Sequence, residues 1–143
     1  MYTGESMNAD TNTERPTARH PEVQKRYDED RRKLEEQYGN DAPCALCHVE
    51  NHRLINATKT MQVVENMYPY QYYDGRAIRE HFMIVPRRHL NSLHDMTRRE
   101  RKDYWSLLAQ FQDSRYASLT RSNGDPKRSV PLHLHTHLIS FFD

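Results

Sequence analysis

Near the C-terminus, histidine occupies every second position of the segment His133-Leu134-His135-Thr136-His137. Because successive side chains of a β-strand point to opposite faces, this alternation predicts a strand with three imidazoles on one face. Leu134, Thr136 and Leu138 would lie on the other face. We therefore predict a strand over Leu132–Phe141, within a sheet that carries histidines on one side.

Three imidazoles in a row allow more than one chemistry. Imidazole is neutral and nucleophilic near pH 7, so the middle residue, His135, could attack phosphorus and form a covalent intermediate. Its neighbours could fix its tautomer, bind phosphate oxygens or protonate a leaving group. Alternatively, His133, His135 and His137 could bind one metal ion together, or they could be surface histidines without a function.

Other segments predict further strands and one long helix. Aromatic and β-branched residues indicate strands at Arg53–Ala57, Thr60–Met67, Ile78–Val85 and Tyr116–Arg121. Residues 68–76, centred on Asp74-Gly75, predict a turn between antiparallel strands. A capping box of Thr97 and Glu100 begins a helix with an apolar stripe at Tyr104, Leu107, Leu108 and Phe111. This order predicts an α+β fold, in which an antiparallel β-sheet packs against a long helix.

The first 40 residues form a separate part of the chain. Residues 1–18 are polar and have no apolar period, so we expect a disordered tail. Residues 19–40 are expected to be an N-terminal helical extension, with a helix over Pro21–Tyr38 that ends before Gly39. A single folded domain is expected over residues 41–143.

Hydropathy and charge indicate the cellular compartment and the type of ligand. The mean hydropathy is −1.05, no apolar run could span a membrane, and the N-terminus has no apolar secretory segment. We expect a soluble, cytoplasmic protein with no membrane partner, whose cysteines form no disulfide. Residues 76–131 contain 12 basic and 6 acidic residues, which suits an anionic ligand such as a phosphate ester, although a solvated basic surface has the same composition.

The only two cysteines, Cys44 and Cys47, have the spacing of a metal-binding knuckle. A closed zinc site needs four ligands, and the further ligands would be histidines. The candidates outside the histidine strand are His48, His52, His81, His89 and His94. The cysteines could instead be incidental, and together with His48 they match the c-type haem attachment motif, which would require an exported protein.

Taken together, these segments resemble the histidine triad (HIT) superfamily of nucleotide hydrolases and transferases. Its signature of histidine alternating with usually hydrophobic residues corresponds to residues 133–139 (HLHTHLI), where Thr136 is a polar exception. Residues 80–93 (EHFMIVPRRHLNSL) resemble the strand and turn that precede the family's long helix. Residues 64–70 (VENMYPY) are similar to its nucleotide-side strand, and the cysteine pair is similar to that of the zinc-containing, bacterial-type branch.

The resemblance implies a role for each histidine of the triad. His135 would attack the α-phosphorus of a nucleoside phosphate ester and form a nucleotidyl-histidine intermediate, and His137 would contact the phosphate. A structural Zn²⁺ ion would be held by Cys44, Cys47, His89 and His133. The site in which all three triad histidines bind one metal then becomes a minor alternative.

The resemblance also implies contacts to the nucleotide. Asn66 matches the position that binds ribose hydroxyls, and Asn123 and Ser129 match polar residues on the phosphate side. The segment before the triad departs from the family, because it is one residue longer and has Arg128 where glutamine is often found. Arg128 could replace that residue as a cationic phosphate contact.

We therefore expect a HIT-like catalytic domain, with the activity of a nucleotide phosphoramidase or phosphohydrolase. The substrate would be a nucleoside phosphoramidate or a dinucleoside polyphosphate, cleaved at the α-phosphate. Two alternatives are a non-catalytic nucleotide-binding or interaction module and an enzyme that removes adenylate from nucleic-acid 5′ ends. The family further implies a homodimer and a purine nucleoside phosphate as substrate. We do not expect nucleic acid as a partner, because no separate module for it is visible.

Overall fold

The longest strand, β6 (Arg76–Pro86), organises the antiparallel sheet. In the computed structural model, which describes residues 17–142, β6 pairs with three strands: β4 (Met61–Glu65), β5 (Tyr70–Tyr73) and β8 (Thr136–Phe141). Three outer strands complete a sheet of seven: β2 (Ala18–Arg19) on β5, β3 (Leu54–Ala57) on β4, and β7 (Ala117–Leu119) on β8. All pairs are antiparallel, so the predicted α+β fold class is confirmed.

The turn at Asp74-Gly75 joins β5 to β6. Both residues have positive φ angles, 55° and 72°, as the two central positions of a type I′ hairpin turn require. The predicted turn is therefore confirmed, but it is shorter than expected. Residues 70–73, which the sequence predicts as part of the turn, form β5, because their backbones pair with β6 and β2.

The histidine strand begins later than predicted. β8 starts at Thr136 rather than at Leu132. The backbone N–H of Leu134 donates to the carbonyl of Leu90 (2.7 Å), and that of His133 closes a turn on Val130 (3.4 Å). These two amides therefore donate hydrogen bonds to groups outside the sheet, and only His137 of the triad lies within the regular strand.

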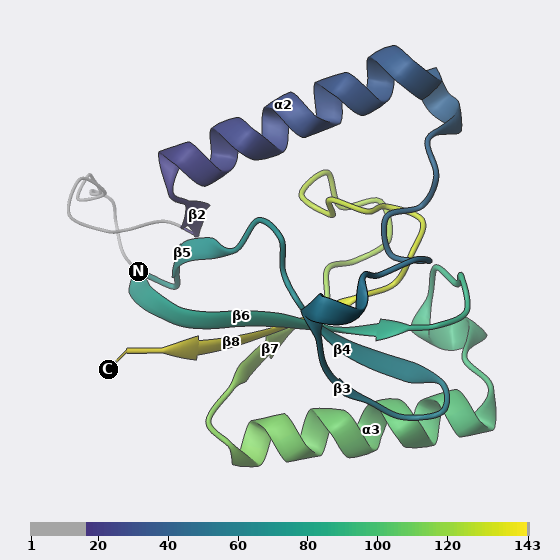
Figure 1. Cartoon of the computed structure of the whole chain (residues 1–143). Coiled ribbons are helices and arrows are strands. Elements are labelled where there is room, and N and C mark those ends of the chain that lie inside the picture. The colour runs from purple at the N-terminus through teal and green to yellow at the C-terminus, as the bar shows by residue number, and fades with distance from the viewer. Residues whose placement is uncertain (1–16, 143) are drawn as a thin grey trace, which may run out of the picture.

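Helix α3 (Arg98–Asp113) covers one face of the sheet (Figure 1). The predicted capping box is confirmed: the Thr97 hydroxyl accepts from the Glu100 amide, and the Glu100 carboxylate accepts from the Thr97 amide. The core under this helix contains Met61, Val63, Ile84, Leu90, Met96, Leu107, Phe111, Leu134 and Leu138. A smaller apolar cluster of Leu46, Val64, Met83 and Val85 includes β4 and β6 residues that alternate with core residues, and so lies on the other face.

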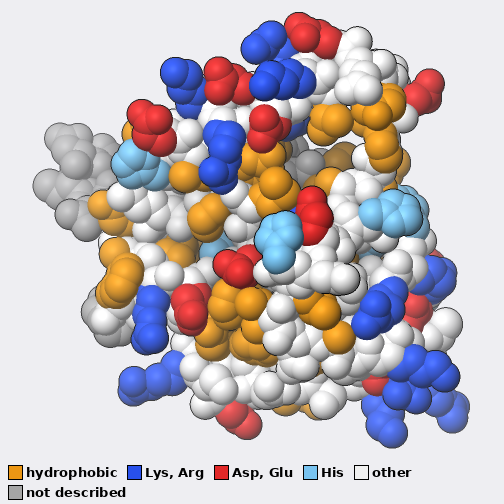
Figure 2. Space-filling view, viewed as in Figure 1, with side chains coloured by type: hydrophobic (Ala, Val, Ile, Leu, Met, Phe, Trp, Pro, Cys, Tyr) orange, Lys and Arg blue, Asp and Glu red, His pale blue; other side chains and the backbone are white. Residues whose placement is uncertain are grey.

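Helix α2 (Pro21–Tyr38) has the predicted bounds and none of its residues is buried. It lies on the side of the sheet opposite α3 (Figure 1). The side chains on the part of α2 visible in Figure 2 are a mixture of acidic and basic groups, as expected for a helix in contact with solvent. Two hydrogen bonds attach it to the chain between β4 and β5: the hydroxyl of Tyr68 donates to Asp30 (2.7 Å), and the guanidinium of Arg26 donates to the carbonyl of Met67.

The remaining regular structure of the described residues consists of single 3₁₀ turns at Gly39–Asp41, Asn51–Arg53 and Leu93–Asp95. Residues 1–16 of the predicted tail lie outside the described residues, and Ala18, its last residue, belongs to β2. Between residues 17 and 142, neither long helix combines the length and the apolar character that a membrane span needs.

Candidate functional site

The four metal ligands implied by the resemblance lie close together. One ligand atom from each of Cys44, Cys47, His89 and His133 falls within 4.8 Å of the others. Sγ of Cys44 is 3.4 Å from Nδ1 of His133, and Sγ of Cys47 is 3.2 Å from Nδ1 of His89. Sulfur and nitrogen ligands of a tetrahedral zinc ion with usual bond lengths are about 3.6 Å apart. The four residues therefore fit a tetrahedral metal ion.

The protonation of His133 and Cys47 is also compatible with metal binding. Nε2 of His133 lies 2.9 Å from the carbonyl oxygen of Pro86. A carbonyl only accepts, so the ring proton is on Nε2, and the lone pair of Nδ1 faces the cysteines, as in metal-ligating histidines. Burial, together with the neighbouring Cys44, raises the pKa of the Cys47 thiol. A bound cation would favour the thiolate.

Other candidate histidines lie elsewhere. Within the described part of the chain, no ligand cluster includes His135 or His137, so the site in which the whole triad binds one metal is not formed. His48, His52 and His94 are exposed and also lie outside the cluster.

His135 is held by the backbone of the residue two positions before it. Its Nδ1 lies 2.9 Å from the carbonyl oxygen of His133, which places the ring proton on Nδ1 and leaves a lone pair on Nε2. The residue is only 2% exposed. Burial lowers the pKa of its imidazole, and the nearby Arg128 lowers it further, so His135 is neutral at pH 7.

His137 pairs with a fourth histidine, His81 of β6, whose Nε2 lies 2.8 Å from Nδ1 of His137. The amide of Tyr70 donates to Nδ1 of His81 (3.0 Å), so the proton of neutral His81 is on Nε2 and points to His137. Burial lowers the pKa of His81 to about 3 and lowers that of His137 well below its usual value. Neutral His137 therefore carries its own proton on Nε2.

From the sequence alone, His81 is only a candidate metal ligand. Its partnership with His137 depends on the register of β6 against β8, where Met83 is opposite His137. A histidine two residues before Met83 on the same face is the signal that could have indicated this pairing once the register was known.

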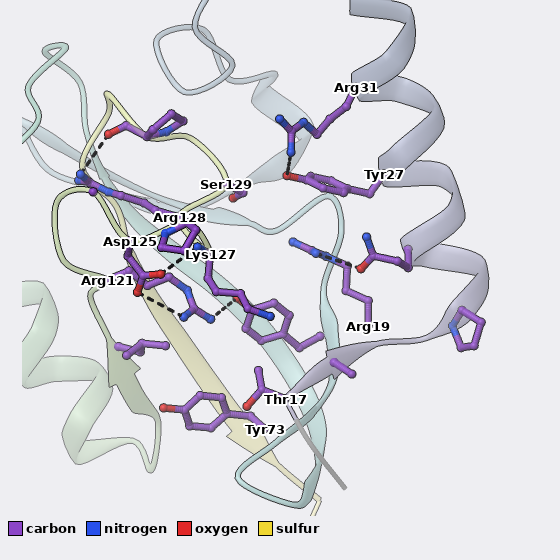
Figure 3. A pocket seen from close by; sticks show the side chains of 18 residues that line it. Thr17, Arg19, Tyr27, Arg31, Tyr73, Arg121, Asp125, Lys127, Arg128 and Ser129 are labelled. Atoms are coloured by element: carbon purple, nitrogen blue, oxygen red, sulfur yellow. Dashed lines mark hydrogen bonds and ion pairs between the residues drawn. The ribbon is translucent and has the colours of Figure 1, made fainter.

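The three polar residues expected to contact nucleotide each have different neighbours in the structure. Asn66 lies beside His81, and its Oδ1 accepts from the amide of Tyr68 (2.8 Å). Oδ1 of Asn123 accepts from Nη1 of Arg128 (2.7 Å). Ser129 lines a large cleft between α2 and the loop before the triad (Figure 3).

Arg128 is buried, and neutral oxygens surround its guanidinium. It donates to the Asn91 and Asn123 side chains (both 2.7 Å) and to the backbone carbonyls of Asn91 (2.8 Å) and Pro131 (3.1 Å). These bonds fix the loop that leads into the triad. No carboxylate among the described residues forms an ion pair with Arg128, so its positive charge stays uncompensated next to His135.

The fold of this chain is similar to those of several solved protein structures. A HIT family hydrolase from Legionella pneumophila Philadelphia 1 superposes with a TM-score of 0.51 at 15% identity, over 68% of this chain and 92% of that one. The chain has the HIT fold. A hypothetical protein from Leishmania major also superposes with a TM-score of 0.51, at 21% identity, over 78% of this chain and 72% of that one. Neither the protein-family models nor the curated protein sequences give a match.

Two features of the fold bring the histidines of the candidate site together. The register between β6 and β8 brings His81 beside His137, and the turn after β6 carries His89 to the side chain of His133. The expected resemblance to the histidine triad superfamily is thus confirmed at the level of the fold.

Proposed function

We propose that the protein is a zinc-containing nucleotide hydrolase or transferase that acts on the α-phosphate of a nucleoside phosphoramidate or dinucleoside polyphosphate. The observation that carries this proposal is the hydrogen bond between Nδ1 of His135 and the His133 carbonyl, which leaves the lone pair on Nε2. A fixed, neutral imidazole of this kind is a good nucleophile for phosphorus. The HIT fold, shared with a protein described as a hydrolase, supports the same reaction class.

In the proposed reaction, Nε2 of His135 bonds to the α-phosphorus while the leaving group departs with the electron pair of the broken P–O or P–N bond, an amine leaving group taking a proton from solvent. The imidazole then carries a positive charge, and its Nδ1–H donates to the His133 carbonyl, which stabilises that charge. Water or another acceptor would release the nucleotide from His135. Because His135 is 2% exposed, neighbouring side chains must move aside when the substrate binds.

His137 would bind the phosphate in this reaction. Its Nε2–H is the only ring donor left after Nδ1 has accepted from His81. A neutral donor can hydrogen-bond a phosphate oxygen as negative charge develops there. His81 would act as a positioning residue, because its contact to His137 fixes the tautomer that donates.

The proposed zinc ion would be held by two thiolates and two imidazoles, from Cys44, Cys47, His89 and His133. When bound, it would act structurally, by connecting the N-terminal part of the domain to the β6 turn and the triad. Its four protein ligands leave no open position for a substrate, so we assign the chemistry to His135 and His137.

The first test compares wild-type protein with His135→Asn on a fluorogenic adenosine phosphoramidate and on diadenosine polyphosphates. We expect the variant to lose at least about 10³-fold in kcat, and alkaline denaturation of wild-type protein with labelled substrate to trap nucleotide on His135, because the P–N bond of the intermediate survives in alkali. His94→Asn, which changes an exposed histidine outside the triad, is the matched control. Turnover that survives in His135→Asn would exclude His135 as the nucleophile. Nucleotide binding without turnover across the panel would favour a non-catalytic binding module.

A further inference from the structure

A cleft of about 1070 Å³ lies between α2 and the loop that precedes the triad. Figure 3 shows side chains entering it from two walls: Arg19, Tyr27 and Arg31 from β2 and α2, and Arg121 and Lys127 from the opposite side. Small-molecule sites occupy about 300–1,000 Å³. The cleft therefore has room for a ligand larger than a mononucleotide.

The charge of the cleft is strongly positive. Among residues 17–142, five cationic side chains line it, against the single carboxylate of Asp125. That carboxylate already accepts from the Lys127 amide (2.8 Å) and lies 4.0 Å from Nη1 of Arg121. At most one of the five charges is therefore balanced by a lining residue, and such a site concentrates anions.

The cations on the α2 wall are held in place by neutral groups. Arg31 donates to the hydroxyl of Tyr27 (3.3 Å), and the guanidinium carbon of Arg19 lies 4.4 Å from the centre of the Tyr27 ring. Arg19 also donates to the carbonyl of Tyr68 (2.8 Å). Among residues 17–142, neither arginine has a carboxylate partner. An anionic ligand would therefore displace no ion pair on this wall.

On the opposite wall, Arg121 connects the cleft to the triad. Its Nη2 donates to the hydroxyl of Tyr70 (2.9 Å), and the Tyr70 ring stacks on His137 with ring centres 5.6 Å apart. Nε of Arg121 is buried and has no hydrogen-bond partner in the described part of the chain. One end of the cleft thus lies next to the proposed phosphate-binding histidine, with an unused donor beside it.

We propose that this cleft binds a chain of several phosphates, held between Arg31 of α2 and Lys127 of the loop before the triad. A phosphoramidate brings only about one negative charge to such a site, whereas an oligophosphate brings several and matches the excess of cations. The N-terminal extension is then part of the substrate site, and it selects oligophosphate substrates over phosphoramidates. This selectivity rests on the proposed reaction at His135, whereas binding to the cleft does not.

The binding test uses inorganic tripolyphosphate, which has no nucleoside, and measures its affinity for the full-length protein by calorimetry. We expect Arg31→Ala and Lys127→Ala each to weaken binding about five- to tenfold. Arg32→Ala is the matched control, because Arg32 neighbours Arg31 on α2 but pairs with Glu36 (3.2 Å) and does not line the cleft. Its affinity should stay within about twofold of wild type. Absence of binding, or equal affinity in all four proteins, would overturn the proposal.

The kinetic test measures kcat/KM for diadenosine tetraphosphate and for adenosine phosphoramidate. Arg31→Ala should lower kcat/KM for the tetraphosphate about five- to tenfold relative to kcat/KM for the phosphoramidate, mainly by raising KM for the tetraphosphate. Equal losses on both substrates would refute the selectivity. If no ester is turned over but tripolyphosphate binding still depends on Arg31, the proposed function fails and the cleft assignment stands. A single-stranded oligonucleotide that binds more tightly than tripolyphosphate, with the same dependence on Arg31, would overturn the assignment to oligophosphate.

Discussion

The carbonyl oxygen of His133 lies 2.9 Å from Nδ1 of His135, while the ring of the same His133 faces Cys44 and Cys47. One residue therefore belongs to the candidate metal cluster through its side chain and orients the candidate nucleophile through its backbone. Because a bound metal would fix the position of His133, it would also fix the acceptor that sets the tautomer of His135. Metal occupancy and catalysis should depend on each other through this residue.

The first prediction follows from this link. Cys44→Ser should abolish stoichiometric zinc binding, lower the melting temperature by about 10 °C or more, and reduce kcat at least about tenfold. The loss of activity is expected although His135 and His137 are unchanged, because the His133 carbonyl loses its fixed position. Elemental analysis, thermal unfolding and steady-state kinetics on one preparation measure the three effects.

The matched control for this prediction is His48→Ala, which removes an exposed side chain adjacent to Cys47 but outside the cluster. It should retain zinc and wild-type stability. A metal-free Cys44→Ser protein with full activity and an unchanged melting temperature would show that the cluster has no structural role.

The second prediction concerns stability in acid and the buried pair of His81 and His137. The folded-state pKa of His81 is about 3, against about 6.5 for an unfolded histidine. Between these values the unfolded chain binds a proton that the folded chain excludes, so the free energy of unfolding falls as the pH drops below 6.5. His137 contributes in the same direction. Each buried histidine should contribute a slope on the order of 1 kcal/mol per pH unit.

Chemical denaturation between pH 4.5 and 7.5 measures this slope. His81→Gln removes one of the titrating groups, and its amide can still accept from the Tyr70 N–H and donate to Nδ1 of His137. The slope should therefore decrease relative to wild type, while stability at pH 7.5 changes less. His94→Gln changes a histidine on the surface for comparison. A slope that decreases equally in both variants would contradict the assignment to His81.

The sequence predicts well those features that depend on nearby residues. The capping box of Thr97 and Glu100 fixes the start of α3, because both partners lie within one helical turn. The alternation around His135 predicts which side chains share a face, because it needs only the geometry of an extended chain. Pro21 and Gly39 mark the ends of α2 in the same local way.

The sequence does not predict features that depend on contacts between distant segments. The sequence places the start of the last strand at Leu132, because nothing local shows that the Leu134 amide bonds to Leu90. The pairing of His81 with His137 joins residues 56 positions apart and requires the register of two strands. The sequence suggests Arg128 as a phosphate contact, and only the fold reveals that Asn91, 37 positions away, accepts from it twice.

The third prediction concerns Thr136, the polar residue at a usually hydrophobic position of the triad segment. Its hydroxyl is buried and lies 2.8 Å from the hydroxyl of Tyr104 and 2.7 Å from that of Thr120. Thr136→Val keeps the shape but removes one member of this hydrogen-bonded group. It should cost about 1–2 kcal/mol of stability.

A double-mutant cycle with Tyr104→Phe tests whether the hydroxyls act together. Tyr104→Phe should cost less in the Thr136→Val background than in wild type, because its partner is already absent. We expect a coupling of about 1 kcal/mol from denaturant unfolding. Strictly additive costs would indicate that the two hydroxyls contribute independently.

The fourth prediction concerns the attachment of α2, which has no buried residue and so must be held by a few contacts. The Tyr68 hydroxyl donates to Asp30 (2.7 Å), and the Tyr68 ring meets that of Tyr27 edge-on, with centres 5.0 Å apart. Burial, with the Asp30 hydrogen bond, raises the pKa of Tyr68 to about 12, so the hydroxyl stays a donor over the working pH range. Tyr68→Phe should weaken the attachment by about 1–2 kcal/mol.

Hydrogen exchange distinguishes this local effect from a loss of global stability. In Tyr68→Phe, the amides of α2 should exchange about 5- to 30-fold faster than in wild type, because this helix can open without unfolding the sheet. The amides of α3, which packs on the core through Leu107 and Phe111, should change much less. Tyr38→Phe, at the exposed end of α2, is the matched control. Equal acceleration in α2 and α3 would mean that Tyr68 stabilises the whole domain rather than the attachment of the helix.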